Sequence, residues 1–117
     1  MRQSLIIMTS LLFLTTSAIA ASKKMTISGT IIDNRCAGLN KAHLSEFIKT
    51  HPKSCALMPQ CAASGYALYH DGKLLEFDKP SSKKVERFLK AKRSTLKVTA
   101  VVEKEGNRYK LDSIKNE

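Results

Sequence analysis

Alternating apolar and polar residues predict a strand over Met25 to Asp33. Within it Ile27, Gly29 and Ile31 alternate with polar residues, which is the period of two of a half-buried strand. Glycine inside a strand weakens pairing and often marks a bulge or a sharp bend. Gly29 therefore predicts a bent first strand, as closure of a small barrel requires.

The same alternation recurs in the second half of the chain. Gly65 to His70 and Lys73 to Asp78 are expected to form a hairpin around Asp71-Gly72, which is a strong short-range turn signal. Two further strands are expected over Leu96 to Glu103 and Arg108 to Ile114.

A three-to-four spacing of apolar residues predicts helices between these strands. Leu44, Phe47 and Ile48 predict a short helix over Lys41 to Thr50, with Asn40 as its N-cap. A further helical turn, ended by Pro59, is expected over Ser54 to Pro59.

A longer helix is expected between the third and fourth strands. Val85, Phe88 and Leu89 form its apolar stripe, which runs from an N-cap at Ser81 or Ser82 to about Lys92. The resulting order is strand, long loop, strand, strand, helix, strand, strand. This is the order of an OB-fold, a five-stranded Greek-key barrel, so we expect a mainly β, OB-like barrel. A five-stranded open sheet with one packed helix is the alternative.

The first 20 residues resemble a secretory signal peptide. Arg2 precedes an apolar run from Leu5 to Leu14, and Ala18-Ile19-Ala20 fits the cleavage rule. Residues 21–117 then form one exported domain, periplasmic or secreted, with no membrane span after cleavage. Loss of Arg2 lowers the net charge of the 117-residue chain from +10 to +9, which favours anionic partners.

One segment resembles a known group of proteins. The motif Cys55-Ala-Leu-Met-Pro-x-Cys61-x-x-Ser-Gly-Tyr66, with an opening Gly29-Thr-x-x-Asp33-x-x-Cys36, is similar to small exported bacterial OB-fold-like domain proteins of unknown function. The resemblance covers most of residues 28–114 and implies the barrel fold and a common role for the three cysteines. Where Gly-Tyr-Gly is expected, this chain has Gly-Tyr-Ala.

Three cysteines, Cys36, Cys55 and Cys61, predict one disulfide and one thiol in an exported protein. A bridge from Cys36 to either partner would close a loop of about 20 residues, worth roughly 3 kcal/mol in the chain-entropy model. We favour such a staple, and the spacing leaves its partner open.

A metal site is the alternative chemistry of the same loop. Three thiolates with His51 or His43 would suit zinc, and Met58 would add a soft ligand for copper(I). The competing interpretation places His51 at a helix end against Phe47 and Ile48, and Met58 in the core.

Nothing in the sequence indicates catalysis. The cysteines lack the Cys-x-x-Cys spacing of disulfide oxidoreductases, and the histidines lack an evident catalytic partner. The chain is therefore predicted not to be an enzyme.

The remaining feature is a basic segment from Lys79 to Lys97, which contains Glu86 as its one acidic residue. A helix face within it is a candidate site for an anionic envelope component or protein: Lys83, Lys84, Arg87 and Lys90. The export signal disfavours nucleic acid. The sequence thus predicts an exported binding or structural module with a stapled loop and a basic face. The alternative is a metal-binding or thiol-redox protein.

Overall fold

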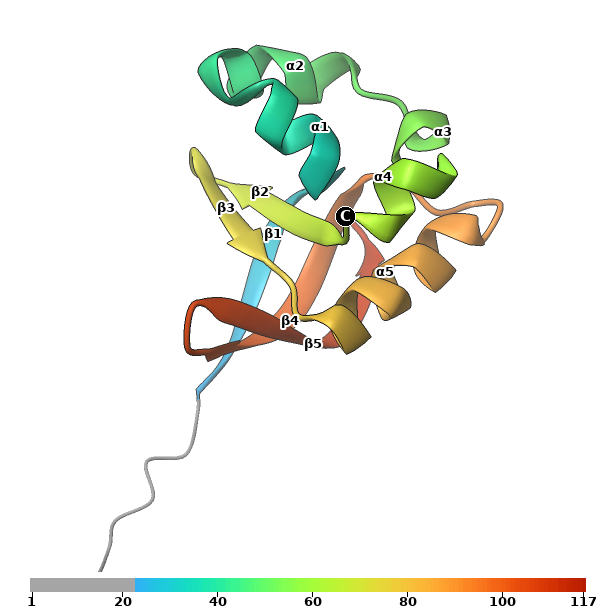
Figure 1. Ribbon diagram of the computed structural model, residues 1–117. Coiled ribbons are helices and arrows are strands. Elements are labelled where there is room, and N and C mark those ends of the chain that lie inside the picture. The colour runs from blue at the N-terminus through green and yellow to red at the C-terminus, as the bar shows by residue number, and fades with distance from the viewer. Residues whose placement is uncertain (1–22) are drawn as a thin grey trace, which may run out of the picture.

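A computed structural model of the protein describes residues 23–117 and shows a curved, antiparallel five-stranded sheet with helices packed against it (Figure 1). The predicted signal peptide lies outside the described residues. The sheet order is β3-β2-β1-β4-β5, and its strands are β1 (Lys24–Asp33), β2 (Tyr66–His70), β3 (Lys73–Glu76), β4 (Lys97–Glu105) and β5 (Arg108–Asn116). All five predicted strands are present, with ends shifted by one to two residues.

β1 is the central strand and pairs with a different neighbour along each half. Lys24 to Thr30 pair with β4, and the last four residues, Thr30 to Asp33, pair with β2, so Thr30 pairs with both. Gly29 lies where the partner changes. A Cβ atom there would collide with the carbonyl oxygen of Tyr69 on β2, so glycine is required for the close approach of the two strands.

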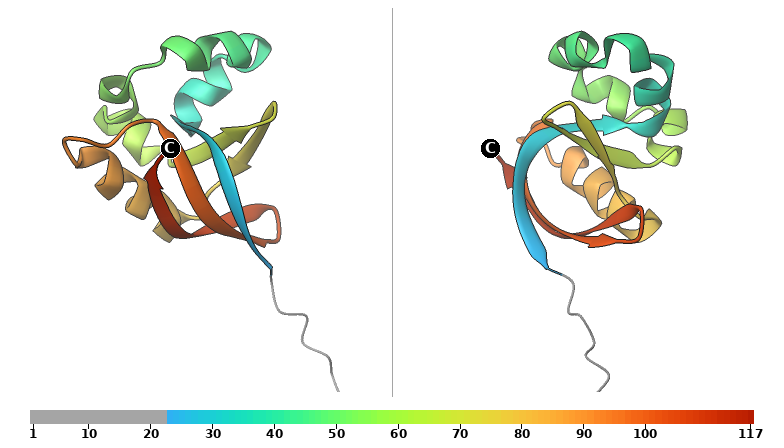
Figure 2. Two further views of the ribbon diagram at one scale, coloured as in Figure 1. Left: turned by 180° about the vertical axis from the view of Figure 1, so that it is seen from behind. Right: turned by 90° about the vertical axis from the view of Figure 1, so that its left-hand side faces the viewer.

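The predicted closed barrel is wrong. The sheet curves strongly (Figure 2), and an isolated bridge joins Phe77, just after β3, to Tyr109 on β5. β3 has four residues whereas β5 has nine, so in the part of the chain that is described no ladder extends this bridge. The open sheet is the better description, and mainly β holds only roughly, because helices contain about as many residues as strands.

The predicted long helix is present as α5 (Lys79–Lys90), but Asp78 is its N-cap. The Asp78 carboxylate accepts a hydrogen bond from the Ser81 backbone N–H at 2.8 Å. Ser81 and Ser82 lie inside the helix, and their buried hydroxyls accept from the backbone N–H groups of Leu111 and Tyr66. The predicted N-caps therefore join α5 to the sheet, which Val85 and Leu89 also contact through the core.

The insertion between β1 and β2 is almost wholly helical. Its elements are α1 (Asn34–Leu39), the 3₁₀ helix η1 (Lys41–His43), α2 (Leu44–Thr50), α3 (Lys53–Ala56) and α4 (Pro59–Ala63). The predicted single helix over residues 41–50 is divided into η1 and α2, and Asn40 makes no capping bond to it. Pro59 begins α4 instead of ending a turn, because proline fits the first position of a helix. No helix among residues 23–117 is long and apolar enough to cross a membrane.

The end of β1 separates two clusters of buried residues. Ile31 belongs to the main core between the sheet and α5. Ile32 faces the other way and packs with Ala37, Ala67 and the apolar side of α2. Both faces of the strand are covered here, so Ile31, Ile32 and Asp33 are all fully buried.

The close approach at Gly29 yields a test of the fold. Gly29→Ala should lower the free energy of unfolding by about 1–3 kcal/mol, the usual cost of overpacking, as measured by urea denaturation. Gly38→Ala is the matched control, because nothing lies within 4 Å of its Cβ position on α1. Alanine is the better helix former by up to about 1 kcal/mol, so this variant should be unchanged or more stable. Equal stability of the two variants would contradict the close approach of β1 and β2 at Gly29.

Candidate functional site

Asp33 is the residue on which the site is built. It is the last residue of β1 and the N-cap of α1, and its Oδ2 accepts a hydrogen bond from the Cys36 backbone N–H at 2.9 Å. The residue is fully buried. Asp33 thus carries a carboxylate into the interior at the point where the strand becomes a helix.

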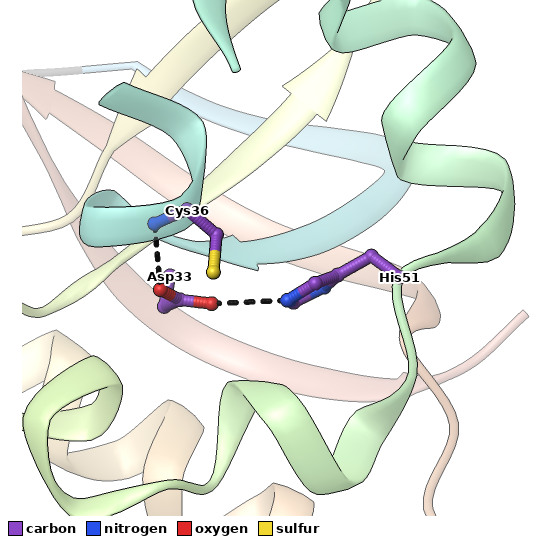
Figure 3. Close-up of side chains that lie close together, drawn as sticks. All are labelled: Asp33, Cys36 and His51. Carbon is purple, nitrogen blue, oxygen red and sulfur yellow. Dashed lines mark hydrogen bonds and ion pairs between the residues drawn. The ribbon is translucent and has the colours of Figure 1, made fainter. Parts of the chain in front are cut away.

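His51 lies opposite the second oxygen of this carboxylate. It follows α2 directly, and its Nε2 is 3.3 Å from Asp33 Oδ1 (Figure 3). The His51 side chain is 2% exposed, and its ring stacks obliquely on Phe47, with centroids 5.1 Å apart. The two groups are not aligned for a hydrogen bond. Asp33 Oδ1 and both His51 ring nitrogens have no hydrogen-bond partner among the described residues.

Cys36 supplies the third donor atom. Its Sγ, Asp33 Oδ1 or Oδ2 and one His51 nitrogen all lie within 4.8 Å of one another. In Figure 3 the sulfur points toward the space between the carboxylate and the imidazole. Segments that are 15 residues apart in the chain thereby meet at one point.

Cys61 adjoins this group from α4. A chain of hydrogen bonds fixes its helix against α1: the Arg35 N–H donates to Ser64 Oγ at 3.0 Å, and Ser64 Oγ donates to the Cys61 carbonyl at 2.6 Å. The Cys61 residue is 3% exposed. Its thiol interacts with the Cys36 thiol and with the Asp33 carboxylate.

Burial sets the protonation of these groups. It raises the pKa of Cys36 to about 12, assisted by the Asp33 carboxylate and the Cys61 thiol. Burial also raises the pKa of Cys61. It lowers the pKa of His51, against the opposing effect of Asp33. The imidazole is therefore neutral at pH 7, which is the form that binds metals.

The Asp33 and His51 donors have the spacing of two ligands on a tetrahedral ion. Oxygen and nitrogen ligands about 2.0–2.1 Å from zinc at tetrahedral angles lie roughly 3.3 Å from one another. This is the separation of Asp33 Oδ1 and His51 Nε2. An ordinary hydrogen bond between such groups is shorter and aligned, so the pair has the spacing of two ligands.

The other predicted site residues lie elsewhere. Cys55 is half-buried on α3, Met58 is 44% exposed and His43 is exposed. None of them is in the group that could hold a metal, which consists of Asp33, Cys36 and His51; Cys61 adjoins this group and is not a member of it either. All three cysteines are free thiols in the structure, so the expected disulfide staple is not present in it.

Asp33 is the site residue that sequence reasoning missed. It was visible as the end of a strand and as part of Asp33-x-x-Cys36, a spacing that fits an N-cap followed by the first turn of a helix. Its approach to His51 depends on the path of the whole insertion, which local patterns do not specify.

Two cavities flank the insertion. The larger, of about 780 Å³, is lined by His51 together with Lys49, Lys53 and Lys97. The smaller, of about 340 Å³, lies at the N-terminal end of α5 and is lined by Lys79, Lys83 and Arg108. Both are basic, so neither suits a cation, and the donor group lies behind His51 in the interior.

The predicted basic face of α5 is partly neutralised. Lys83 and Lys90 each lie 3.8 Å from Glu86, and Lys84 Nζ donates to the Leu111 carbonyl at 3.3 Å. Arg87 is exposed. Of the four predicted residues, Lys83 is the one that lines either of these two cavities among residues 23–117.

No protein-family model matches the chain, and comparison with curated proteins and with solved structures finds no match. The argument for function therefore depends on the geometry of the site.

The raised pKa of Cys36 yields a prediction for the reduced, metal-free protein. Only the thiolate reacts with iodoacetamide, so alkylation of Cys36 should stay slow between pH 8 and 10. At pH 8 its thiolate fraction should be about a thousand-fold below that of an ordinary thiol. Peptide-resolved mass spectrometry measures this rate, with the urea-unfolded chain as control. A rate in the folded protein that rises with an apparent pKa near 9 would contradict the burial described here.

Proposed function

We propose that the protein is an exported metal-binding module that holds a zinc ion through Asp33, Cys36 and His51, with Cys61 as the fourth ligand. The observation that carries this proposal is the buried, unpartnered state of Asp33 Oδ1 and both His51 nitrogens. A zinc ion between them would give Asp33 Oδ1 and His51 Nε2 a partner.

The buried Asp33 and His51 groups carry a free-energy cost as long as they lack hydrogen bonds. A buried polar group without a partner costs about 1–3 kcal/mol, and more if it is charged. Buried polar groups in folded proteins are therefore nearly always paired. A carboxylate and an imidazole placed 3.3 Å apart without a hydrogen bond leave this cost in place, whereas coordination of a cation would remove it.

The donor set favours zinc over copper(I). Zinc accepts thiolate, imidazole and carboxylate ligands together in tetrahedral sites, whereas copper(I) prefers soft sulfur donors. Met58, the soft ligand that the sequence offered, is exposed and outside the group. The group contains the hard Asp33 carboxylate and lacks the soft Met58 thioether.

The burial of the site favours a closed, holding role. Asp33 Oδ1 and the His51 nitrogens are shielded from solvent, whereas catalytic zinc keeps a position open for water or substrate. The ion would join the end of β1, the start of α1, the end of α2 and α4. A domain with a core this small gains much from such a cross-link.

Zinc titration of the reduced, metal-free protein tests the proposal. We expect stoichiometric binding, measured by competition with a chromogenic chelator. We also expect a rise in unfolding free energy of about 2.7 kcal/mol at a free zinc concentration 100 times the Kd. Asp33→Asn, Cys36→Ser and His51→Gln should each weaken binding by about 100-fold or more, beyond the 10- to 100-fold effect of outer-shell changes.

The controls separate a ligand from a structural residue. Asparagine caps helices as well as aspartate does, so Asp33→Asn keeps the start of α1 and removes the charge. His43→Gln and Cys55→Ser alter residues outside the group and should bind zinc as the unaltered protein does. Equal zinc affinity in the Asp33→Asn, His51→Gln and His43→Gln variants would refute the site.

The small cavity supports a second candidate function, the binding of a small anion. Lys79, Lys83 and Arg108 line its 340 Å³ beside the first turn of α5, and Arg108 is also paired with Glu76 at 3.3 Å. The positive end of the helix dipole adds to this field. The sequence predicted an anionic partner on the exposed face of α5. This candidate function places the anion in the cavity instead.

Lys83→Glu should weaken binding of inorganic phosphate several-fold, as followed by isothermal titration calorimetry. Lys90→Glu is a closely matched control, because Lys90 lies the same 3.8 Å from Glu86, is similarly exposed and does not line the cavity. An equal loss of phosphate affinity in both variants would contradict binding in the cavity, because the overall charge of the helix would then explain the effect.

A further inference from the structure

Cys36 and Cys61 are neighbouring thiols at the junction of α1 and α4. Besides the bonds through Ser64 Oγ, Asn34 Nδ2 donates to the Ser64 carbonyl at 2.9 Å, and the Asn34 N–H donates to the Gly65 carbonyl at 2.9 Å. These bonds join the first turn of α1 to the end of α4. The two thiols that they bring together interact with each other.

The third cysteine is placed differently. Cys55 lies on α3, whose contact with the sheet is made by the Tyr66 hydroxyl, which donates to the Ala56 carbonyl at 2.7 Å. Cys55 is not among the groups that shift the pKa of Cys36 or Cys61. The sequence leaves the partner of Cys36 open, and the arrangement of the helices favours Cys61 over Cys55.

We propose that the metal site is redox-gated: a disulfide exchange that joins Cys36 to Cys61 removes two of the four ligands and releases the zinc ion. This inference rests on the proposed zinc site and adds its regulation. An oxidised compartment, which the predicted export signal implies, would then favour the metal-free state, and a reducing partner would restore binding.

The reaction balances with a small-molecule disulfide as the oxidant. The Cys36 thiolate, which is the more exposed of the two, attacks one sulfur of glutathione disulfide and expels a glutathione thiolate. The Cys61 thiolate then attacks the Cys36 sulfur of this mixed disulfide and expels the second glutathione. Two protein thiolates lose two electrons in total, one disulfide of the oxidant is reduced to two thiolates, and Zn²⁺ passes to solvent.

Loss of both thiolates leaves a weak site. Asp33 and His51 alone supply two ligands, whereas structural zinc sites have four. Formation of the bond and departure of the metal should therefore occur together, with one zinc released for each disulfide formed.

The experiment treats the zinc-loaded protein with glutathione disulfide in the presence of a chromogenic chelator. Zinc release is followed by absorbance, and the disulfide is mapped by mass spectrometry of peptides prepared under acid quench. We expect a peptide that links residues 36 and 61, and one zinc released per bond. Cys55→Ser is the matched control and should behave in the same way, because its thiol takes no part.

Cys61→Ser separates the two chemical steps. If this variant still binds zinc, its reaction should stop at the mixed disulfide, seen as a glutathione adduct on Cys36, because no second thiol is there to expel it. The apo form of the same variant should stop at the same adduct, formed at the slow rate expected for metal-free Cys36, so the nature of the product does not depend on residual zinc binding.

The outcomes are distinct. A bond that involves Cys55, or zinc that is retained after the bond between Cys36 and Cys61 has formed, overturns the gating and leaves the zinc site standing. A reduced protein that takes up no zinc overturns the proposed function, and the gating with it.

Discussion

The buried Asp33 carboxylate is the constraint on which the rest of the insertion depends. One of its oxygens fixes the start of α1 by accepting the Cys36 N–H, and the other faces His51 across 3.3 Å. A single side chain therefore sets the direction in which the chain leaves the sheet and the place to which it must return. A buried oxygen in this position costs free energy unless it is hydrogen-bonded, and among the described residues Oδ1 accepts no hydrogen bond.

The two cores explain why this position is available. Ile31 and Ile32 face opposite clusters, so the strand passes between the main core and the helices α1 and α2. Residues Lys24 to Thr30 of β1 are exposed or partly buried, whereas Ile31, Ile32 and Asp33 at its end are all buried. A residue at this end of β1 is shielded from water on both faces of the strand, which explains why the Asp33 carboxylate is fully buried.

Much of the scaffold was predictable because its signals are local. The Asp71-Gly72 hairpin, the apolar stripe of α5 and the alternation in β4 each depend on neighbours in the sequence. Barrel closure was wrong because it depends on the length of β3 relative to β5. Of the group formed by Asp33, Cys36 and His51, the sequence predicted Cys36 and His51 but not Asp33. Cys55, Met58 and Cys61 were also predicted and are not members of this group. Short helices such as α3 and α4 lack the periodicity that would show which way their side chains face.

A disulfide and a metal ion are different solutions to the same problem, the attachment of a long insertion to a small core. The surroundings of the cysteines distinguish them. A bond between Cys36 and Cys61 would satisfy the two sulfurs and leave Asp33 Oδ1 and His51 buried without partners, at a cost of about 1–3 kcal/mol for each group. A bound ion would instead give the carboxylate, the imidazole and the thiolates a common partner. The proposed metal site would therefore account for the buried polar groups that a disulfide alone leaves without hydrogen bonds.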